Sequence, residues 1–231
     1  MKPYARHLEK LRKLKRREYH PLAHKIHKKH KISRKTLFYV KEYGTHTNVP
    51  RTIIKESIKI LLLASVLSSL GGLSLEHIKI VFVSIIPLVI LLPALNDMLG
   101  DIGSIFSSKY SAMLHEGLVK GNLWKNHRVR KLFAQLFVIA AIMALFSSSI
   151  AITISYFSGF AMDMTLVMKI MLITMADVLI LVSLIFIIAT VAGIYFFKKK
   201  EDPNNFLIPI TTSIADFGNM FILSLLILLV F

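Results

Sequence analysis

Five long apolar segments dominate this chain of 231 residues, and they restrict the folds that it can adopt. They cover approximately residues 56–75, 79–108, 132–157, 169–197 and 206–231. Each segment is long enough to cross a hydrocarbon core of about 30 Å as an α-helix. We therefore predict an all-α integral membrane protein with five transmembrane helices per chain.

A basic N-terminal arm precedes the apolar segments. Residues 1–50 contain fifteen Lys and Arg residues but only three acids, and the whole chain has a formal charge of +16 although 55% of it is hydrophobic. Membrane proteins with basic cytosolic parts combine these properties naturally, whereas soluble domains rarely do. The sequence thus predicts two regions, a cytosolic arm over residues 1–50 and a five-helix membrane domain over residues 51–231.

The arm is expected to bind the anionic head groups of lipids rather than nucleic acid. Its basic run at residues 12–17 suits either partner. A membrane anchor follows it, however, and each basic residue near an anionic membrane surface gains about 1 kcal/mol. Four histidines with helical spacing leave transition-metal binding open as an alternative to a solvated basic face: His20, His24, His27 and His30.

The distribution of positive charge orients the predicted helices. If the segments cross the membrane in turn, 27 of the 29 Lys and Arg residues lie on one side, and only Lys79 and Lys169 lie on the other. Because loops rich in Lys and Arg stay in the cytosol, we expect a cytosolic N-terminus and an external C-terminus. We expect the plasma membrane to be the location.

Four carboxylates lie within the apolar segments: Asp97, Asp101, Asp177 and Asp216. An acid at the centre of a bilayer costs at least about 2.5–3.5 kcal/mol, and such groups usually mark the path of an ion or a substrate. No Lys or Arg lies at a comparable depth to neutralise them. The pattern indicates that their partner is a cation that binds reversibly.

The spacing of these polar residues places them on common helix faces. Asp97 and Asp101 are four residues apart and point to the same side of a helix, where a cation would relieve their repulsion. Thr212, Asp216 and Asn219 form a second stripe that offers oxygen atoms. Oxygen ligands favour Mg²⁺, Ca²⁺ or Mn²⁺, and the chain has no cysteine for softer metals. These five residues are the candidate metal ligands.

Asp177 lies outside both stripes. We interpret it as a hydrogen-bonding partner of another helix. An intramembrane aspartyl hydrolase that uses Asp177 and Asp216 is an alternative, although the Gly-x-Gly-Asp context of such enzymes is absent before Asp216. A membrane-anchored scaffold is a further alternative, but it leaves the four acids unexplained.

Signals for catalysis are otherwise missing from the sequence. It contains no Gly-rich phosphate loop, no serine-elbow pattern and no H-E-x-x-H motif. We therefore expect that the chain is not an enzyme and that it holds no resident cofactor. The transported or bound divalent cation is its expected ligand.

Two motifs resemble a known family of membrane proteins. Residues 93–104 read PALNDMLGDIGS, which is similar to the pattern P-x-L-x-x-x-x-G-N-x-G-S in the second membrane helix of the MgtE magnesium channels and their eukaryotic solute-carrier relatives. Residues 202–216 read DPNNFLIPITTSIAD, which resembles D-P-D-N-x-x-x-P-x-x-T-S-x-x-D at the start of the fifth helix of that family. The resemblance covers approximately residues 50–231 and has the two motifs in the right order around five helices.

The resemblance implies a fold, an ion and a site. It implies transport of Mg²⁺ through a pore, and the pore aspartate of the family corresponds to Asp216. An asparagine of the family corresponds to Asp101, so an acid replaces an amide there. The 231 residues hold no counterpart of the nucleotide-binding regulatory domains of the bacterial channels. They hold one five-helix unit where the eukaryotic relatives have two, which implies a homodimer with a central pore.

Overall fold

The computed structural model describes residues 49–119, 126–199 and 202–231, so the predictions for the arm lie almost wholly outside the described residues. The described part of the chain is all-helical, and five of its helices are long and apolar enough to span a membrane. This confirms the predicted fold class. The helices are α4 (Val49–His77), α5 (Lys79–Ser84), α6 (Ile86–His115), α7 (His127–Phe157), α8 (Met164–Lys198) and α9 (Pro203–Val230).

The predicted second segment, residues 79–108, is two helices instead of one, because a proline divides it, and the second helix continues beyond residue 108. The short helix α5 ends before Ile85, whose ψ of 84° is not helical, and α6 then begins with Pro87 in its first turn. Proline has no N–H and clashes with the carbonyl four residues before it, so it interrupts a helix but starts one without loss. At its other end α6 continues through the polar residues to His115.

Side-chain caps explain why three helices begin before the apolar segments do. Asn126 Oδ1 accepts from the N–H groups of Arg128 at 3.0 Å and Val129 at 3.4 Å. Asp163 Oδ1 accepts from Leu166 N at 2.9 Å at the start of α8, and Asp202 caps α9 in the same way. These bonds satisfy N–H groups that the first turn of a helix leaves without a partner. The helices therefore start at the caps, three to five residues ahead of the predicted apolar boundaries.

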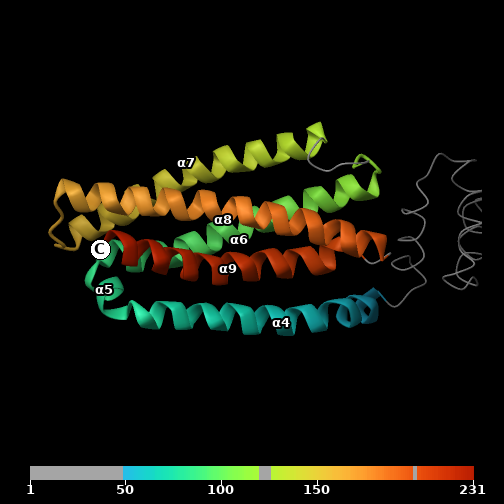
Figure 1. Cartoon of the computed structure of the whole chain (residues 1–231), viewed down its shortest axis with the longest axis horizontal. Helices are drawn as coiled ribbons and strands as arrows, with labels where there is room; N and C mark the ends of the chain where they lie inside the picture. The colour runs from blue at the N-terminus through green and yellow to red at the C-terminus, as the bar shows by residue number, and fades with distance from the viewer. Residues whose placement is uncertain (1–48, 120–125, 200–201) are drawn as a thin grey trace, which may run out of the picture.

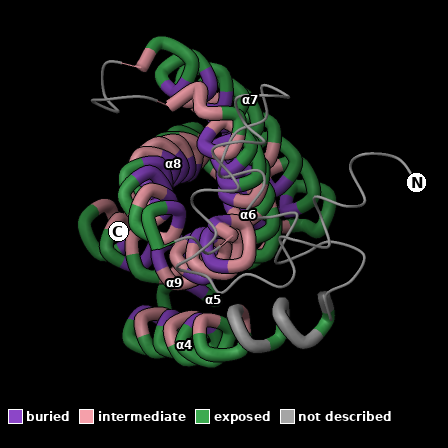
Figure 2. Tube along the Cα trace, turned by 90° about the vertical axis from the view of Figure 1, so that its right-hand side faces the viewer, coloured by how far each residue is buried: buried purple, intermediate pink, exposed green. Residues whose placement is uncertain are grey.

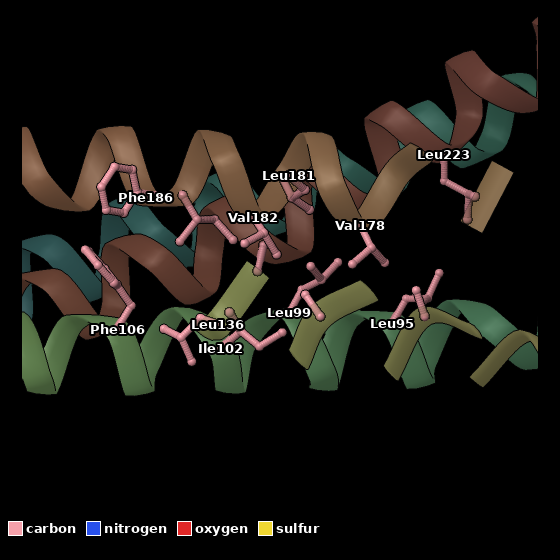
Figure 3. Packing of buried hydrophobic residues seen from close by; sticks show 14 of the residues in the cluster. Leu95, Leu99, Ile102, Phe106, Leu136, Val178, Leu181, Val182, Phe186 and Leu223 are labelled. Atoms are coloured by element: carbon pink, nitrogen blue, oxygen red, sulfur yellow. The ribbon is translucent and has the colours of Figure 1, made fainter. Parts of the chain in front are cut away.

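The long helices form a bundle whose interior lies between α6, α8 and α9, with α7 packed on α6 and α8, and α4 packed on α9 (Figures 1 and 2). Small residues bring the helices close: a Cβ on Gly193 would lie 2.7 Å from the ring of Tyr110. Close approach matters because the hydrophobic effect does not drive helices together in lipid, so their association depends on van der Waals packing and hydrogen bonds. The buried core (Figure 3) includes Leu95, Leu99, Ile102, Phe106, Leu136, Val178, Leu181, Val182, Phe186 and Leu223.

The two ends of the bundle differ in charge. The start of α4, the end of α6 and the start of α9 meet at one end, and the C-terminus lies at the other (Figure 1). Described basic residues gather at the first end: Lys109, Arg128, Arg130, Lys131, Lys198 and Lys199. The second end has Lys79 and Lys169.

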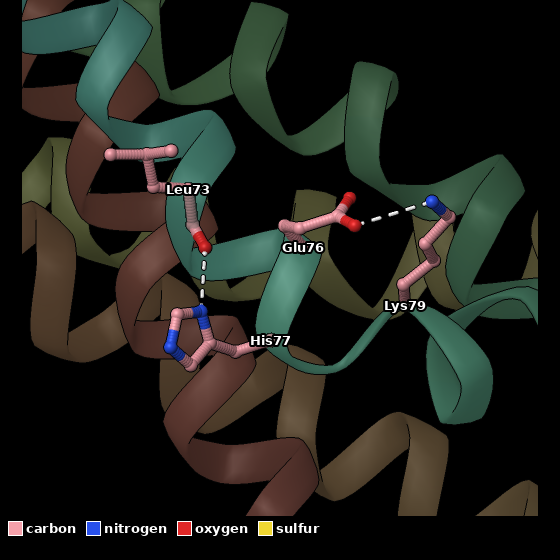
Figure 4. Close-up of polar contacts among 4 residues, drawn as sticks. All are labelled: Leu73, Glu76, His77 and Lys79. Carbon is pink, nitrogen blue, oxygen red and sulfur yellow. Dashed lines mark hydrogen bonds and ion pairs between the residues drawn. The ribbon is translucent and has the colours of Figure 1, made fainter.

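The turn between α4 and α5 lies at the second end (Figure 1), and Figure 4 shows its polar contacts. There His77 Nδ1 lies 3.1 Å from the Leu73 carbonyl oxygen, and Lys79 Nζ lies 3.3 Å from Glu76 Oε1. Glu76 and Lys79 are exposed, and an exposed ion pair contributes at most about 1 kcal/mol. This turn therefore pairs Lys79, one of the two Lys residues described at this end, with an acid, and the pair contributes little to stability.

Candidate functional site

Asp216 lies on α9 where α4 packs against it. The carboxylate is partly buried, and its Oδ2 accepts a hydrogen bond from Ser68 Oγ at 3.3 Å. Gly71 makes the approach of α4 possible, because a Cβ there would come within 3.0 Å of Met220 Sδ and 3.1 Å of the Phe217 Cα. Helix α4 is therefore a third element of the site, beside α6 and α9.

Sequence reasoning missed Ser68, whose partner is 148 residues away along the chain. The stretch Ser68-Ser69-Leu70-Gly71-Gly72 was a usable signal, because small and hydroxyl-bearing residues favour helix contacts in membranes.

Helix α6 meets α9 through glycines and hydroxyl groups. A Cβ on Gly103 would come within 3.0 Å of the Thr211 Cβ, and Ser107 Oγ lies 3.1 Å from Thr211 Oγ1. One turn nearer the start of α6, a Cβ on Gly100 would be 3.9 Å from Thr212 Cγ2. The two motif segments recognised in the sequence therefore pack directly against each other.

Thr212 combines this contact with bonds to its own helix. Its Oγ1 donates to the carbonyl oxygen of Ile208 at 3.0 Å or of Pro209 at 3.2 Å. A hydroxyl oxygen that donates its only hydrogen retains lone pairs. Thr212 therefore has acceptor capacity left for a cation or for water.

Asp97 and Asp101 are exposed on α6, although both lie within its membrane-spanning length. The buried face of the same helix carries Leu95, Leu99 and Ile102, so the two acids point away from the interior of this single chain. Among the described residues, no group of three or more His, Cys, Asp or Glu side chains is close enough together to hold a metal ion. One chain thus presents Asp97 and Asp101 on the exposed side of α6 without a closed set of acidic ligands among its described residues.

Asn219 is fully buried between α9 and α6. Its Nδ2 donates to Asn96 Oδ1 and lies 3.5 Å from the Leu92 carbonyl oxygen. The structure therefore brings Asn219 together with Asn96, the residue before Asp97, and not with Asp97 or Asp101 themselves. Its role as a metal ligand stays a prediction, and the observed bond fixes the register of α6 against α9.

Asp177 has no exposed surface and lies on the buried face of α8. Neither of its carboxylate oxygens has a hydrogen-bond partner among the described residues, so the expected bond to another helix is not found. The hydrolase alternative is not supported either. Two catalytic aspartates must reach one substrate bond, but Asp177 is enclosed while Asp216 is directed to Ser68 on α4.

The basic end of the bundle also joins α6 to α9. His115, the last residue of α6, places Nε2 3.7 Å from Asp202 Oδ1, the cap of α9. The His115 ring packs edge-on against Phe197 near the end of α8, with ring centroids 5.3 Å apart. The two motif helices are therefore connected at this end as well as through Gly103 and Thr211.

Comparison with known proteins bears on this arrangement. The sequence model of a family described as MgtE, divalent cation transporter, matches residues 92–226, which is more than half of the chain. The match begins in α6 and ends in α9, so it contains all five candidate metal ligands. No curated protein and no solved structure matches the chain.

Proposed function

The chain belongs to the MgtE family of divalent cation transporters, and from this premise we propose that it moves Mg²⁺ across the membrane through a pore at the axis of a homodimer. The single observation that supports this most strongly is the exposure of Asp97 and Asp101 on α6 at membrane depth. Acids in that position are costly against lipid and are usually found beside water-filled or ion-conducting paths.

Oxygen chemistry supports Mg²⁺ as the ion. The proposed ligands Asp216, Asp101, Asp97 and Thr212 offer carboxylate and hydroxyl oxygens, which suit hard cations. Mg²⁺ releases its water reluctantly and is commonly bound by one or two carboxylates through a retained hydration shell. A pore with few direct ligands can therefore pass the hydrated ion.

A second copy of the chain would complete the site. Two-fold symmetry places the same surface of each copy against the other, so the acidic faces of both α6 helices would meet. The acids would then be shielded from lipid, and ligands from the two copies would surround one path. Asn219 and Ser68 fit supporting roles here, because one holds α6 on α9 and the other orients the Asp216 carboxylate.

Ion flux into liposomes that contain the purified protein tests the function. We expect Mg²⁺ uptake down its gradient well above that of empty liposomes, with competition from Mn²⁺ or Co²⁺ and little flux of K⁺. Transport of no divalent cation would contradict the proposal. Passage of K⁺ as readily as Mg²⁺ would contradict the proposed ion.

The proposed orientation has the basic end in the cytosol of a cell whose plasma membrane holds the protein. Five crossings then place Phe231 outside, and the basic arm near anionic lipid head groups. We expect a reporter that is active only outside the cytosol to work when it is fused after Phe231. A reporter that is active only in the cytosol serves as the control at the same position, and its activity there would reverse the proposed orientation.

A further inference from the structure

One acid in the membrane domain has no place in the proposed pore. Asp177 lies midway along α8, has no exposed surface, and has two oxygens without a hydrogen-bond donor among the described residues. The buried residues around it on α8 are Ile173, Thr174, Val178 and Leu181, and the Thr174 hydroxyl already donates to the Ile170 carbonyl oxygen at 2.8 Å. An isolated carboxylate in such surroundings is among the most costly groups in a protein.

Neighbouring helices supply no compensating charge. The titratable groups on the neighbouring helices are Asp97, Asp101, Lys109, Tyr110 and His115 on α6, and His127, Arg128, Arg130, Lys131 and Tyr156 on α7. Helix α9 has Asp216 and its cap Asp202, and α8 itself has Lys169, Tyr195, Lys198 and its cap Asp163. Within the described part of the chain, none of these groups lies within hydrogen-bonding or salt-bridging distance of Asp177.

Tyr110 and Lys169 could each donate a hydrogen bond to a carboxylate, but both side chains have other partners. Tyr110 is buried, but its hydroxyl lies 3.3 Å from the carbonyl oxygen of Thr190, which is about 20 Å along α8 from Asp177. Lys169 donates to the Val230 carbonyl oxygen at 2.9 Å and lies over the Phe231 ring. A proton is the smallest cation that can neutralise Asp177 without any other ligand in place.

Asp177 also lies close to the part of α9 that carries the pore acid. One turn after it, Leu181 packs against Gly218, and that contact leaves no room for a Cβ on the glycine. Gly218 is two residues from Asp216. A charge that appears at Asp177 would therefore disturb a close contact between α8 and the segment of α9 that carries Asp216.

We propose that Asp177 is a proton-binding site that makes cation transport depend on pH. With the proton bound, α8 and α9 pack as observed. When the proton leaves, the charged carboxylate favours an arrangement of the α8–α9 contact that admits water. This inference rests on the proposed transport function for its consequence, but the proton site itself does not depend on that function.

The test compares three proteins in liposomes at equal internal and external pH over a range of values. Asp177→Asn keeps the shape of the side chain but cannot exchange a proton, so we expect its Mg²⁺ flux to stay near the wild-type value at low pH and to lose the pH transition. Asp163→Asn is the matched control, because it removes an acid from the same helix while asparagine still caps α8. It should retain the wild-type profile. A wild-type profile in Asp177→Asn would overturn the proposed coupling.

A second measurement separates the proton site from the transport function. Infrared spectra of the wild type should contain the carbonyl band of a buried protonated carboxylic acid, and this band should be lost in Asp177→Asn. Asp177→Leu should lose it too, which serves if the asparagine variant does not fold. If the wild type transports no divalent cation, the proposed function fails, and this band still decides the proton site. Its absence from the wild type would overturn the site.

Discussion

Replacing Asp216 with asparagine is expected to remove most divalent cation flux while leaving the protein folded. Asparagine has nearly the same volume, and its amide oxygen can still accept the hydrogen bond from Ser68 that Asp216 Oδ2 accepts at 3.3 Å. The negative charge is lost, however. A hydrogen bond to a charged group contributes about 1.5–3 kcal/mol, which corresponds to about 10- to 140-fold in affinity. We expect a loss of this size in ion affinity for each copy of the site.

Two measurements check this expectation together. Mg²⁺ flux in liposomes should fall strongly, and the increase in Tm that Mg²⁺ gives the purified protein should shrink, because a ligand stabilises only the state that it binds. Glu76→Gln is the control, since it also removes one acid, but from an exposed turn at the end of the bundle. Wild-type flux together with wild-type stabilisation in Asp216→Asn would show that Asp216 is a structural acid and not a pore ligand.

The number and order of the membrane helices could be predicted from the sequence, because the length of an apolar run is a direct measure of whether it spans a bilayer. The ends of the helices were harder to predict. At Asn126, Asp163 and Asp202 a polar cap, and not the first apolar residue, decides where a helix begins. The break at Ile85 depends on Pro87, whereas Pro93 lies inside α6 and Pro209 inside α9. A proline alone therefore did not indicate where a helix would stop.

The faces of the helices were harder to predict than their lengths. Helix α8 is apolar on almost all sides, so its pattern does not indicate which side faces the bundle, and an acid such as Asp177 gives no sign of its burial. Spacing correctly grouped Asp97 with Asp101 on one exposed side of α6. Spacing did not predict that Asn219 and Asp216 contact different helices, because two residues three positions apart share a helix face and can still have different neighbours. Asn219 is paired with Asn96 across the helix interface, and only tertiary packing determines this.

The proposed homodimer predicts that the exposed sides of two α6 helices face each other, and a single introduced cysteine can test this. The chain contains no cysteine, so one introduced residue gives a cross-link without background. Ser104 follows Asp101 by three residues and lies on the same side of α6. A two-fold axis beside this face would place Ser104 opposite its own copy, because each residue near such an axis lies close to its equivalent.

We therefore expect Ser104→Cys to form covalent dimers in most chains when a short bis-thiol reagent is added to protein in mild detergent or liposomes. Ser149→Cys makes the same chemical change at an exposed position of α7, a different helix that packs on α6 and α8, and it should remain monomeric. Equal dimer yields at the two positions would indicate random collision. A monomeric Ser104→Cys protein that still transports Mg²⁺ would contradict the shared pore. In that case the exposure of Asp97 and Asp101 at membrane depth would have to be explained within one chain. Its described residues contain no closed set of acidic ligands.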